Sequence, residues 1–262
     1  MSNRYVALLD VLGFASIVSG DRQGERLGQY LSALQAAVSQ ESSVSPLEYV
    51  VFSDSIVLTT ADASEASLRA LVVACARSFH LLLRQEIALR GAISLGSVIV
   101  EKTSGGTFVA GSAVVEGYMY EKSQDWVGIM LAPSAVRANP DLAQRCNIGP
   151  TDVPEGRVAL RGRFPWPACV HVCHRIPFHS SNEFESNTFD GFAILPTNHT
   201  DDAEGIRDDL TWSLTQLLWL KALAPDPRAQ QKYQQSHDWI GRAEGEWKDA
   251  AHWFAQERER SA

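Results

Sequence analysis

The order of apolar runs in this 262-residue sequence predicts an α+β fold, a ferredoxin-like βαββαβ sandwich with a C-terminal extension of strands and helices. Three observations lead to this prediction. Apolar runs of strand length alternate with segments of helical periodicity, neighbouring runs are joined by short polar turns, and the pattern repeats before residue 133. The predicted order up to that residue is β-α-ββ-α-ββ-α-β.

The first predicted strand is the apolar run RYVALLD at residues 4–10. A turn at Gly13 follows and leads into the start of a helix. Residues 42–46 are predicted to be a loop. Between the Gly13 turn and this loop, residues 24–39 carry apolar side chains at helical spacing, which predicts a helix with one buried face: Leu27, Tyr30, Leu31, Leu34 and Val38.

Residues 47–60 predict a hairpin of two strands around the polar break Ser53-Asp54-Ser55. Asp62 and Glu65 have the spacing of a capping box, which predicts the start of an amphipathic helix. The expected core stripe of that helix is Leu68, Leu71, Val72, Cys75, Phe79, Leu82 and Leu83.

The next predicted strand covers residues 89–101 and turns or bulges near Gly96, because a glycine inside a strand pattern often marks a bulge. A loop is expected at residues 102–106. The run FVAG at 108–111 leads into a predicted helix at 112–122, and residues 126–133 predict a further strand.

The last third of the chain differs in character, so we expect a domain at residues 1–140 and an extension at 141–262. Short strands and loops are predicted at 156–195, and a helix at 204–223. In the final segment an aromatic or large apolar residue recurs every seven positions, which predicts an amphipathic helix that packs on the domain or on a partner: Tyr233, Ile240, Trp247 and Phe254.

The composition is that of a globular chain, with 45% hydrophobic and 21% charged residues. The formal net charge of −8 argues against a protein that coats nucleic acid, although it does not exclude a nucleotide substrate. The apolar runs are shorter than the roughly 20 residues that a membrane-spanning helix needs, and the N-terminus is a poor signal peptide. We therefore expect a cytoplasmic protein with no membrane or nucleic-acid partner.

The four cysteines are Cys75, Cys146, Cys169 and Cys173, and a cytosolic chain keeps its cysteines reduced. The segment CVHVCH at 169–174 resembles a metal knuckle, but its spacing does not match the usual zinc pairs. In a strand, Cys169, His171 and Cys173 share one face. We expect a structural strand here, with a metal site as the alternative.

Two aspartates occupy matching places in the predicted fold. Asp10 ends the first strand, and Asp54 lies at the hairpin turn, so the two carboxylates are expected to meet at one end of the sheet. Paired carboxylates suit Mg²⁺ or Mn²⁺, and Gly13 lets the backbone approach a phosphate near a helix N-terminus. The simpler interpretation of Ser-Asp-Ser is a polar turn, and the two interpretations are compatible.

These residues resemble the class III nucleotidyl cyclases, which carry Asp-x-x-Gly-Phe after the first strand, as in DVLGF at 10–14, and a Gly-Asp hairpin turn, matched by Ser53-Asp54. A later Gly-Ile-x-x-Gly strand is similar to GAISLG at 91–96, with Ala92 inserted. Gly111 and Glu121 match the ends of the family's dimer-face helix. The segments FSDSIVL, LRGAISLGSV and AGSAVVEGYMYEKSQDWVGIML look like the bacterial pyrimidine cyclases of Pycsar antiphage defence.

The resemblance, which covers roughly residues 4–135, implies a metal-dependent cyclisation. Two Mg²⁺ or Mn²⁺ ions on Asp10, Val11 and Asp54 hold the triphosphate, the ribose 3′-hydroxyl attacks the α-phosphate, and pyrophosphate leaves. It also implies a homodimer with sites at the protomer interface, and a separate effector protein that reads the product. The implied substrate-binding residues are Val11, Leu12, Gly13, Phe14, Tyr49, Val50 and Ser53.

The sequence departs from the family at two positions of the dimer-face helix, where Val115 and Met119 replace an Asn and an Arg. Arg90 is the candidate catalytic replacement and Lys122 a second one, and either cation is alternatively a surface residue. Tyr49 and Val50 stand where purine cyclases select their base, with Glu48 nearby. A bulky Tyr49 suits a smaller pyrimidine, or is simply a β-favouring residue.

The predicted activity is therefore conversion of UTP to 3′,5′-cyclic UMP and pyrophosphate, as a second messenger in antiphage defence. Uracil and cytosine reverse one donor and one acceptor, so a cytidylate cyclase that makes cyclic CMP is the close alternative. The missing Asn and Arg also permit a catalytically silent module that senses nucleotides or dimerises. A fold whose acidic turns are purely structural is the third alternative.

Overall fold

The computed structural model describes residues 2–21, 23–42, 45–104, 106–140, 142, 170–177, 188–199 and 202–261. Its sheet has the strand order β2-β3-β1-β4-β6-β8-β7, and β5 pairs with β4 off this path. β1 (Ser2–Leu12) runs antiparallel to both β3 (Ser55–Thr60) and β4 (Ala88–Thr103), and β2 (Leu47–Phe52) forms a hairpin with β3. The order 2-3-1-4, with crossover helices, confirms the predicted ferredoxin-like α+β fold.

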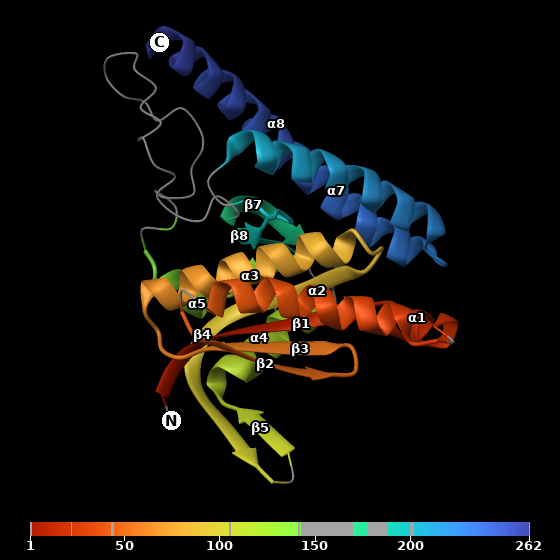
Figure 1. Cartoon of the computed structure of the whole chain (residues 1–262), viewed down its shortest axis with the longest axis vertical. Coiled ribbons are helices and arrows are strands. Elements are labelled where there is room, and N and C mark those ends of the chain that lie inside the picture. The colour runs from red at the N-terminus through yellow and green to blue at the C-terminus, as the bar shows by residue number, and fades with distance from the viewer. Residues whose placement is uncertain are drawn as a thin grey trace.

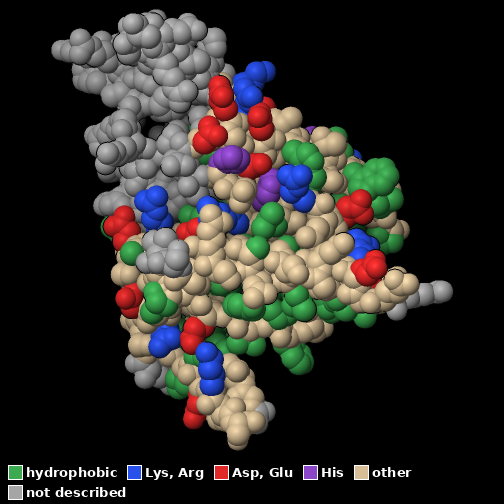
Figure 2. All heavy atoms as spheres, in the orientation of Figure 1, with side chains coloured by type: hydrophobic (Ala, Val, Ile, Leu, Met, Phe, Trp, Pro, Cys, Tyr) green, Lys and Arg blue, Asp and Glu red, His purple; other side chains and the backbone are tan. Residues whose placement is uncertain are grey.

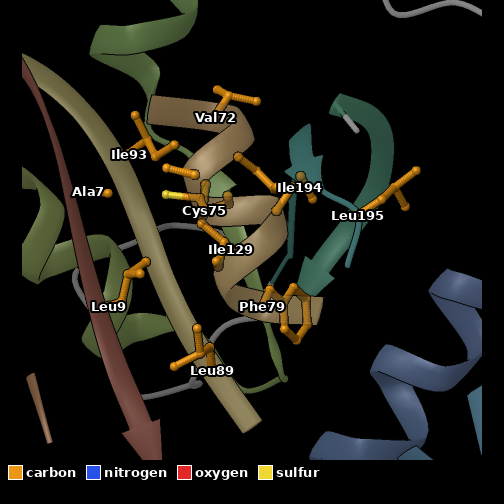
Figure 3. Packing of buried hydrophobic residues seen from close by; sticks show 14 of the residues in the cluster. Ala7, Leu9, Val72, Cys75, Phe79, Leu89, Ile93, Ile129, Ile194 and Leu195 are labelled. Atoms are coloured by element: carbon orange, nitrogen blue, oxygen red, sulfur yellow. The ribbon is translucent and has the colours of Figure 1, made fainter. Parts of the chain in front are cut away.

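One face of the sheet is covered by α2 (Glu25–Ser42) and α3 (Glu65–Leu83), with the short α1 (Phe14–Gly20) at the end of β1 (Figure 1). Every member of the predicted α3 stripe is buried. In Figure 3, Cys75 and Phe79 of α3 lie against the sheet, near Ile129 and Ile194. Local periodicity therefore identified the core helix correctly.

Helix α3 is also the one helix among the described residues that is long and apolar enough to cross a membrane. Its length and composition contradict the prediction that all apolar stretches are of strand length. Most of this helix is buried inside the fold, because it packs against the sheet on one side and against α7 on another. A central core helix has this composition for that reason.

The opposite face of the sheet is covered by α4 (Ser112–Ser123), which packs on β1 and β4. β5 (Gly106–Ala110) pairs with the distal part of β4, so that the two form a projecting arm (Figure 1). β6 (Gly128–Leu131) lies parallel to β4, and α5 (Pro133–Arg137) follows it. The predicted element order is confirmed up to this point.

Two predicted details are wrong. β4 pairs with β1 in one unbroken register past Gly96, so the strand neither turns nor bulges there, and the hairpin turn lies between Thr103 and Gly106. A Cβ at Gly96 would lie 2.5 Å from Ser112 Oγ and 2.9 Å from Ala113 N. The glycine therefore lets the N-terminus of α4 approach the sheet.

The predicted capping box before α3 is the other wrong detail. Ser64, not Asp62, is the N-cap, because its side chain accepts a hydrogen bond from Ser67 N. Asp62 instead accepts from Ser64 N at 2.9 Å and from Ser67 Oγ at 2.6 Å. Hydrogen bonds with the side chain of Ser64, the side chain of Ser67 and the N–H of Ser64 lower the pKa of Asp62 to about 2.

The C-terminal part of the chain continues the same sheet. β8 (Thr188–Ile194) pairs antiparallel with β6, and β7 (Val170–Pro177) pairs with β8, so the predicted strand over His171 and Cys173 is confirmed. Cys169 and the side chains of His171 and Cys173 lie outside the described part, as does Cys146, so the metal alternative stays a prediction. The division at residue 140 is likewise a prediction.

Two long helices, α7 (Ala203–Leu223) and α8 (Pro227–Ser261), pack antiparallel across the molecule (Figure 1). Ile240 and Trp247 of the heptad series are buried and Tyr233 is half-buried, whereas the side chain of Phe254 lies outside the described residues. Trp239 meets Trp126 edge-on, with ring centroids 4.9 Å apart. The aromatic side of α8 therefore packs on its own chain.

Candidate active site

The paired ends of the central strands form one row of residues across the sheet. Phe52 of β2 faces Ser55 of β3, Ser55 faces Asp10 of β1, Asp10 faces Arg90 of β4, and Arg90 faces Gly128 of β6. Partners in such a row share a face of the sheet. The face is that of α4, since Arg90 also contacts Glu121 on that helix.

Arg90 binds two buried carboxylates at once. Its Nη2 lies 2.9 Å from Asp10 Oδ2 and 2.6 Å from Glu121 Oε1, while Nη1 donates to the carbonyl of Gln124 at 3.2 Å. Asp10 and Arg90 are each 7% exposed and Glu121 is 1% exposed. Burial raises the pKa of Glu121, Arg90 opposes that rise, and the charge of Asp10 adds to it.

Asp54 lies beside Asp10 because the β2–β3 turn is bonded to β1. The N–H of Val11 donates to the carbonyl of Asp54 at 2.8 Å, and Asp10 pairs with Ser55. The turn has two central residues, and Ser53 has a φ of +56°. A positive φ at the first central residue is typical of a type II′ turn, in which glycine is favoured. Ser53 therefore occupies a glycine position, as the resemblance implies.

The β1–α1 connection is the second backbone feature near Asp10. Gly13 has a φ of +75° and precedes α1, and a Cβ on it would meet no atom within 4 Å. Phe14 follows and meets Tyr30 of α2 edge-on at 6.2 Å. Burial and the charge of Asp54 raise the pKa of Tyr30 to about 12. Helical spacing predicted Tyr30 as a core residue. Its closeness to Asp54 was not predicted, because that closeness depends on tertiary packing.

The residues present fit a hard divalent cation. Asp10 and Asp54 supply carboxylates at neighbouring chain positions, and Val11 supplies a backbone carbonyl. The described residues contain no group of three or more His, Cys, Asp or Glu that would enclose a metal. Mg²⁺ sites commonly use one or two carboxylates and complete their shell with substrate phosphates and water. The bond from Arg90 uses Oδ2 of Asp10, and a carboxylate has a second oxygen for a metal.

The two candidate base-selecting residues lie on opposite faces of β2. Val50 pairs with Val57, which pairs with Leu8, so it shares the face of Asp10. Tyr49 pairs with Leu58 and lies on the other face, at the edge of the sheet. The structure brings Val50 to the side of the row and places Tyr49 away from it.

The three remaining candidates lie on α4, where Val115 and Met119 are exposed and Lys122 is half-exposed. Lys122 Nζ lies 3.7 Å from Glu121 Oε2. Arg90, by contrast, lies next to Asp10 of its own chain. Any contribution of Arg90 to an Asp10 site is therefore made within the same protomer.

Several contacts of this site were missed by the sequence analysis. Gln124 donates to the carbonyl of Gly91 and accepts from the indole N–H of Trp126, which fixes the chain after α4. Asp125, the next residue, contacts Arg228 and Lys232 of α8. Except for the bond between Gln124 and Trp126, these partners are more than 30 residues apart in sequence, so no local pattern indicates them.

Fold and geometry together define an α+β protein in which Asp10 and Asp54 lie on bonded segments at one end of a ferredoxin-like sheet. No family model and no curated protein matches the sequence. Solved structures that are similar include the adenylyl cyclase CyaB from P. aeruginosa, at 11% identity and a TM-score of 0.45, covering 76% of this chain and 96% of that chain. The guanylate cyclase domain of RhGC from Catenaria anguillulae, in complex with GTP, has 10% identity and a TM-score of 0.44, covering 74% and 96%. At these values the likeness assigns no family, and the fold rests on its own strand order.

Proposed function

We propose that the protein is a metal-dependent nucleotidyl cyclase of the class III type that converts UTP to 3′,5′-cyclic UMP and pyrophosphate. The observation that carries this proposal is the place of Asp10 and Asp54. They lie on bonded segments of β1 and the β2–β3 turn, and Asp10 is three residues before Gly13, where a Cβ would meet no atom within 4 Å. Two carboxylates beside such a turn suit a metal-bound triphosphate.

The chain's own residues divide the work as follows. Asp10, Asp54 and the Val11 carbonyl would hold two Mg²⁺ or Mn²⁺ ions, which neutralise the triphosphate and activate the 3′-hydroxyl when bound. The turn of Leu12, Gly13 and Phe14 lets the chain approach phosphate oxygens. The 3′-hydroxyl loses its proton to water, and its oxygen forms a bond to the α-phosphorus. The bond between the α-phosphorus and the oxygen that bridges it to the β-phosphorus breaks, and pyrophosphate leaves. Most of the rate gain comes from positioning.

Arg90 keeps Asp10 oriented and balances its charge before substrate arrives, because the two groups are bonded in a buried place. Ser53 holds the turn that presents Asp54. Val50 lines the row on the β2 side, where a base would lie. A small apolar residue there leaves base selection to other polar groups, so CTP and a cyclic CMP product are the alternative within the same mechanism.

The proposal includes a homodimer with its sites at the protomer interface. The α4 side of the molecule exposes large apolar side chains that are unusual on a free surface: Phe52, Val115, Tyr118 and Met119. Figure 2 also shows hydrophobic side chains gathered below α2, where Figure 1 has the β2–β3 hairpin. We further propose that the enzyme acts in the cytoplasm in antiphage defence and that a separate effector reads its product.

The test is incubation of the purified protein with each of the four ribonucleoside triphosphates and Mn²⁺, with products identified by mass spectrometry. Cyclic UMP that disappears in Asp54→Ala is the expected result. Cyclic CMP as the main product would change the substrate and keep the mechanism. No cyclic product from any triphosphate in a dimeric sample would overturn the enzyme.

A silent nucleotide-binding module is the second candidate, and one observation favours it. Asp10 is nearly buried and already bonded to Arg90, which resembles a structural ion pair. The same incubation separates the two candidates, provided that nucleotide binding is measured alongside by calorimetry. Binding without turnover would select the module.

A further inference from the structure

The C-terminal helix α8 brings two cations to the end of the sheet where Asp10 lies. Arg90 donates to the carbonyl of Gln124 at 3.2 Å, and the next residue is Asp125. Asp125 Oδ1 lies 3.6 Å from Arg228 Nε and 3.6 Å from Lys232 Nζ. Cations from β4 and from α8 therefore meet around one short segment of chain.

Helix α8 is fixed in this place by contacts with the two residues that follow Asp125. Val127 N donates to Ser236 Oγ at 2.8 Å, and Trp126 meets Trp239 edge-on. Ser236 lies one helical turn after Lys232. The segment then enters the sheet at Gly128, which pairs with Arg90. The cations on α8 are thus held against the site by the core of the molecule.

Lys232 faces one carboxylate, that of Asp125, and two other cations, Arg90 and Arg228. Its side chain is 18% exposed, and burial together with the positive charge of Arg90 lowers its pKa, against the opposing effect of Asp125. Among the described residues, the Nε of buried Arg90 has no hydrogen-bond partner. A buried donor without an acceptor and two mutually repelling cations are both relieved by an anion.

The strand order indicates on which side of Asp10 the anion would lie. Val50 on β2 and Asp54 at the β2–β3 turn lie on one side of Asp10, while Arg90 on β4 and the α8 cations lie on the other. A nucleotide whose base lies toward β2 and whose phosphates reach Asp10 directs its terminal phosphates toward β4 and α8. That end of the ligand is the one that needs cations.

We propose that Lys232 and Arg228 of α8, together with Arg90, bind the β- and γ-phosphates of the nucleotide and the pyrophosphate that leaves. The identity of the substrate rests on the proposed cyclase function, whereas the polyphosphate site rests on the cluster itself. The C-terminal extension then completes the active site within one protomer and supplies the positive charge that the uncharged Val115 and Met119 do not.

The competing explanation is that these ion pairs only anchor α8. Asp125 distinguishes the two, because it neutralises the cations. In a polyphosphate site, Asp125→Asn releases both cations and tightens anion binding, whereas Lys232→Met weakens it. In a structural anchor, both substitutions loosen the helix. Their effects on anion affinity then do not have opposite signs.

The experiment is calorimetric titration of the full-length protein with inorganic pyrophosphate in Mg²⁺. We expect Lys232→Met to weaken binding by about tenfold and Arg228→Gln by about threefold, as for loss of charge-assisted hydrogen bonds. Asp125→Asn is expected to strengthen binding by about threefold. The control is Lys248→Met, the same change at an exposed site about 24 Å farther along α8, which should leave the affinity unchanged.

Affinity for uridine monophosphate is the second control, since the variants should alter the polyphosphate end alone. Equal pyrophosphate affinity in Lys232→Met and Lys248→Met, or weakened binding in Asp125→Asn, overturns the proposal, as does a wild-type protein that does not bind pyrophosphate. If Lys232→Met does not fold, Arg228→Gln and Asp125→Asn carry the same comparison.

Pyrophosphate binding that depends on Lys232 in a protein without cyclase activity would overturn the proposed function alone. Cyclase activity with unchanged kcat and KM in Lys232→Met would overturn the α8 site alone.

Discussion

At the scale of single residues, the guanidinium of Arg90 is the group that joins the two buried carboxylates of the site. It bonds Asp10 and Glu121 together, and all three groups are nearly buried. A buried ion pair contributes little net stability, but removal of one member leaves an uncompensated charge. The arrangement gives Arg90 a second carboxylate to bind when Asp10 turns toward a cation. Glu121 is therefore expected to set how easily Asp10 is released.

Glu121→Gln tests this role. The variant removes a buried negative charge, so Arg90 binds Asp10 more strongly and competes better with a metal. We expect affinity for Mn²⁺, measured by electron paramagnetic resonance, to fall about fivefold, while the free energy of unfolding stays within about 1 kcal/mol. Glu101→Gln, an exposed position on the arm, is the matched control. Unchanged Mn²⁺ affinity in Glu121→Gln contradicts the prediction.

Ser53 at the β2–β3 turn has a backbone conformation that favours glycine. Its φ of +56° costs an ordinary residue about 1–2 kcal/mol, and glycine adopts it without a steric penalty. Ser53→Gly is expected to raise the free energy of unfolding by up to about 1 kcal/mol in urea titrations. Ser55→Gly, inside β3, is expected to lower it by about 0.5–1 kcal/mol. A loss of stability in Ser53→Gly would show that the serine hydroxyl contributes more than the turn geometry.

At the scale of elements, α4 has two different sides. Its inner side packs on β1 and β4 at close distance, since Gly117 lies where a Cβ would be 3.3 Å from Ser94 Oγ. Its outer side exposes Val115, Tyr118 and Met119. A helix of an independent monomer usually presents polar residues to water. This pattern is the structural basis of the dimer in the proposed function.

Val115→Glu places a charge at the centre of that outer side, where 60% of Val115 is exposed. Burial of an unpaired carboxylate opposes association, so the expected result is a monomer in sedimentation velocity with an unchanged fold by circular dichroism. The same change at Val18 on α1, which is also exposed, should leave the dimer intact. A dimer that survives Val115→Glu and dissociates in Val18→Glu would move the interface to α1.

The elements show which parts of the molecule the sequence could predict. The stripe of α3, and the closeness of Asp10 to the turn that carries Asp54, were predictable because each depends on local spacing and on the order of neighbouring strands. Gly96 was misread because its cause is a close approach by Ser112, which no local pattern contains. The link from Arg90 to Lys232 has the same origin, since it joins β4 to a helix more than 130 residues later.

At the scale of the whole molecule, a buried polar junction ties the ferredoxin-like core to the C-terminal helices. His80 of α3 lies 3.7 Å from Asp209 of α7. Asp209 also accepts from Thr197 Oγ1 at 2.9 Å and from Asn198 N at 2.8 Å. These bonds join the core helix, the segment after β8 and α7. The contact between α7 and the core therefore includes a buried titratable group, His80.

The pH dependence of stability follows from the surroundings of His80. Burial lowers its pKa, Asp209 opposes this, Arg84 adds to it, the carbonyl of Pro196 opposes it, and His199 adds to it. Because the unfolded chain keeps the ordinary value near 6.5, it binds a proton as the pH falls below that value while the folded protein does not. Stability is thus fully present above about pH 6.5 and is lost as the pH falls toward the lowered folded pKa, by at most about 1.4 kcal/mol per pH unit for one proton. His80→Gln is expected to flatten this slope in urea titrations at pH 5 to 8.

Asp209→Asn removes the carboxylate that raises the pKa of His80, so the loss of stability should extend to lower pH. Equal slopes in wild type and His80→Gln would show that other groups govern the acid sensitivity of the junction.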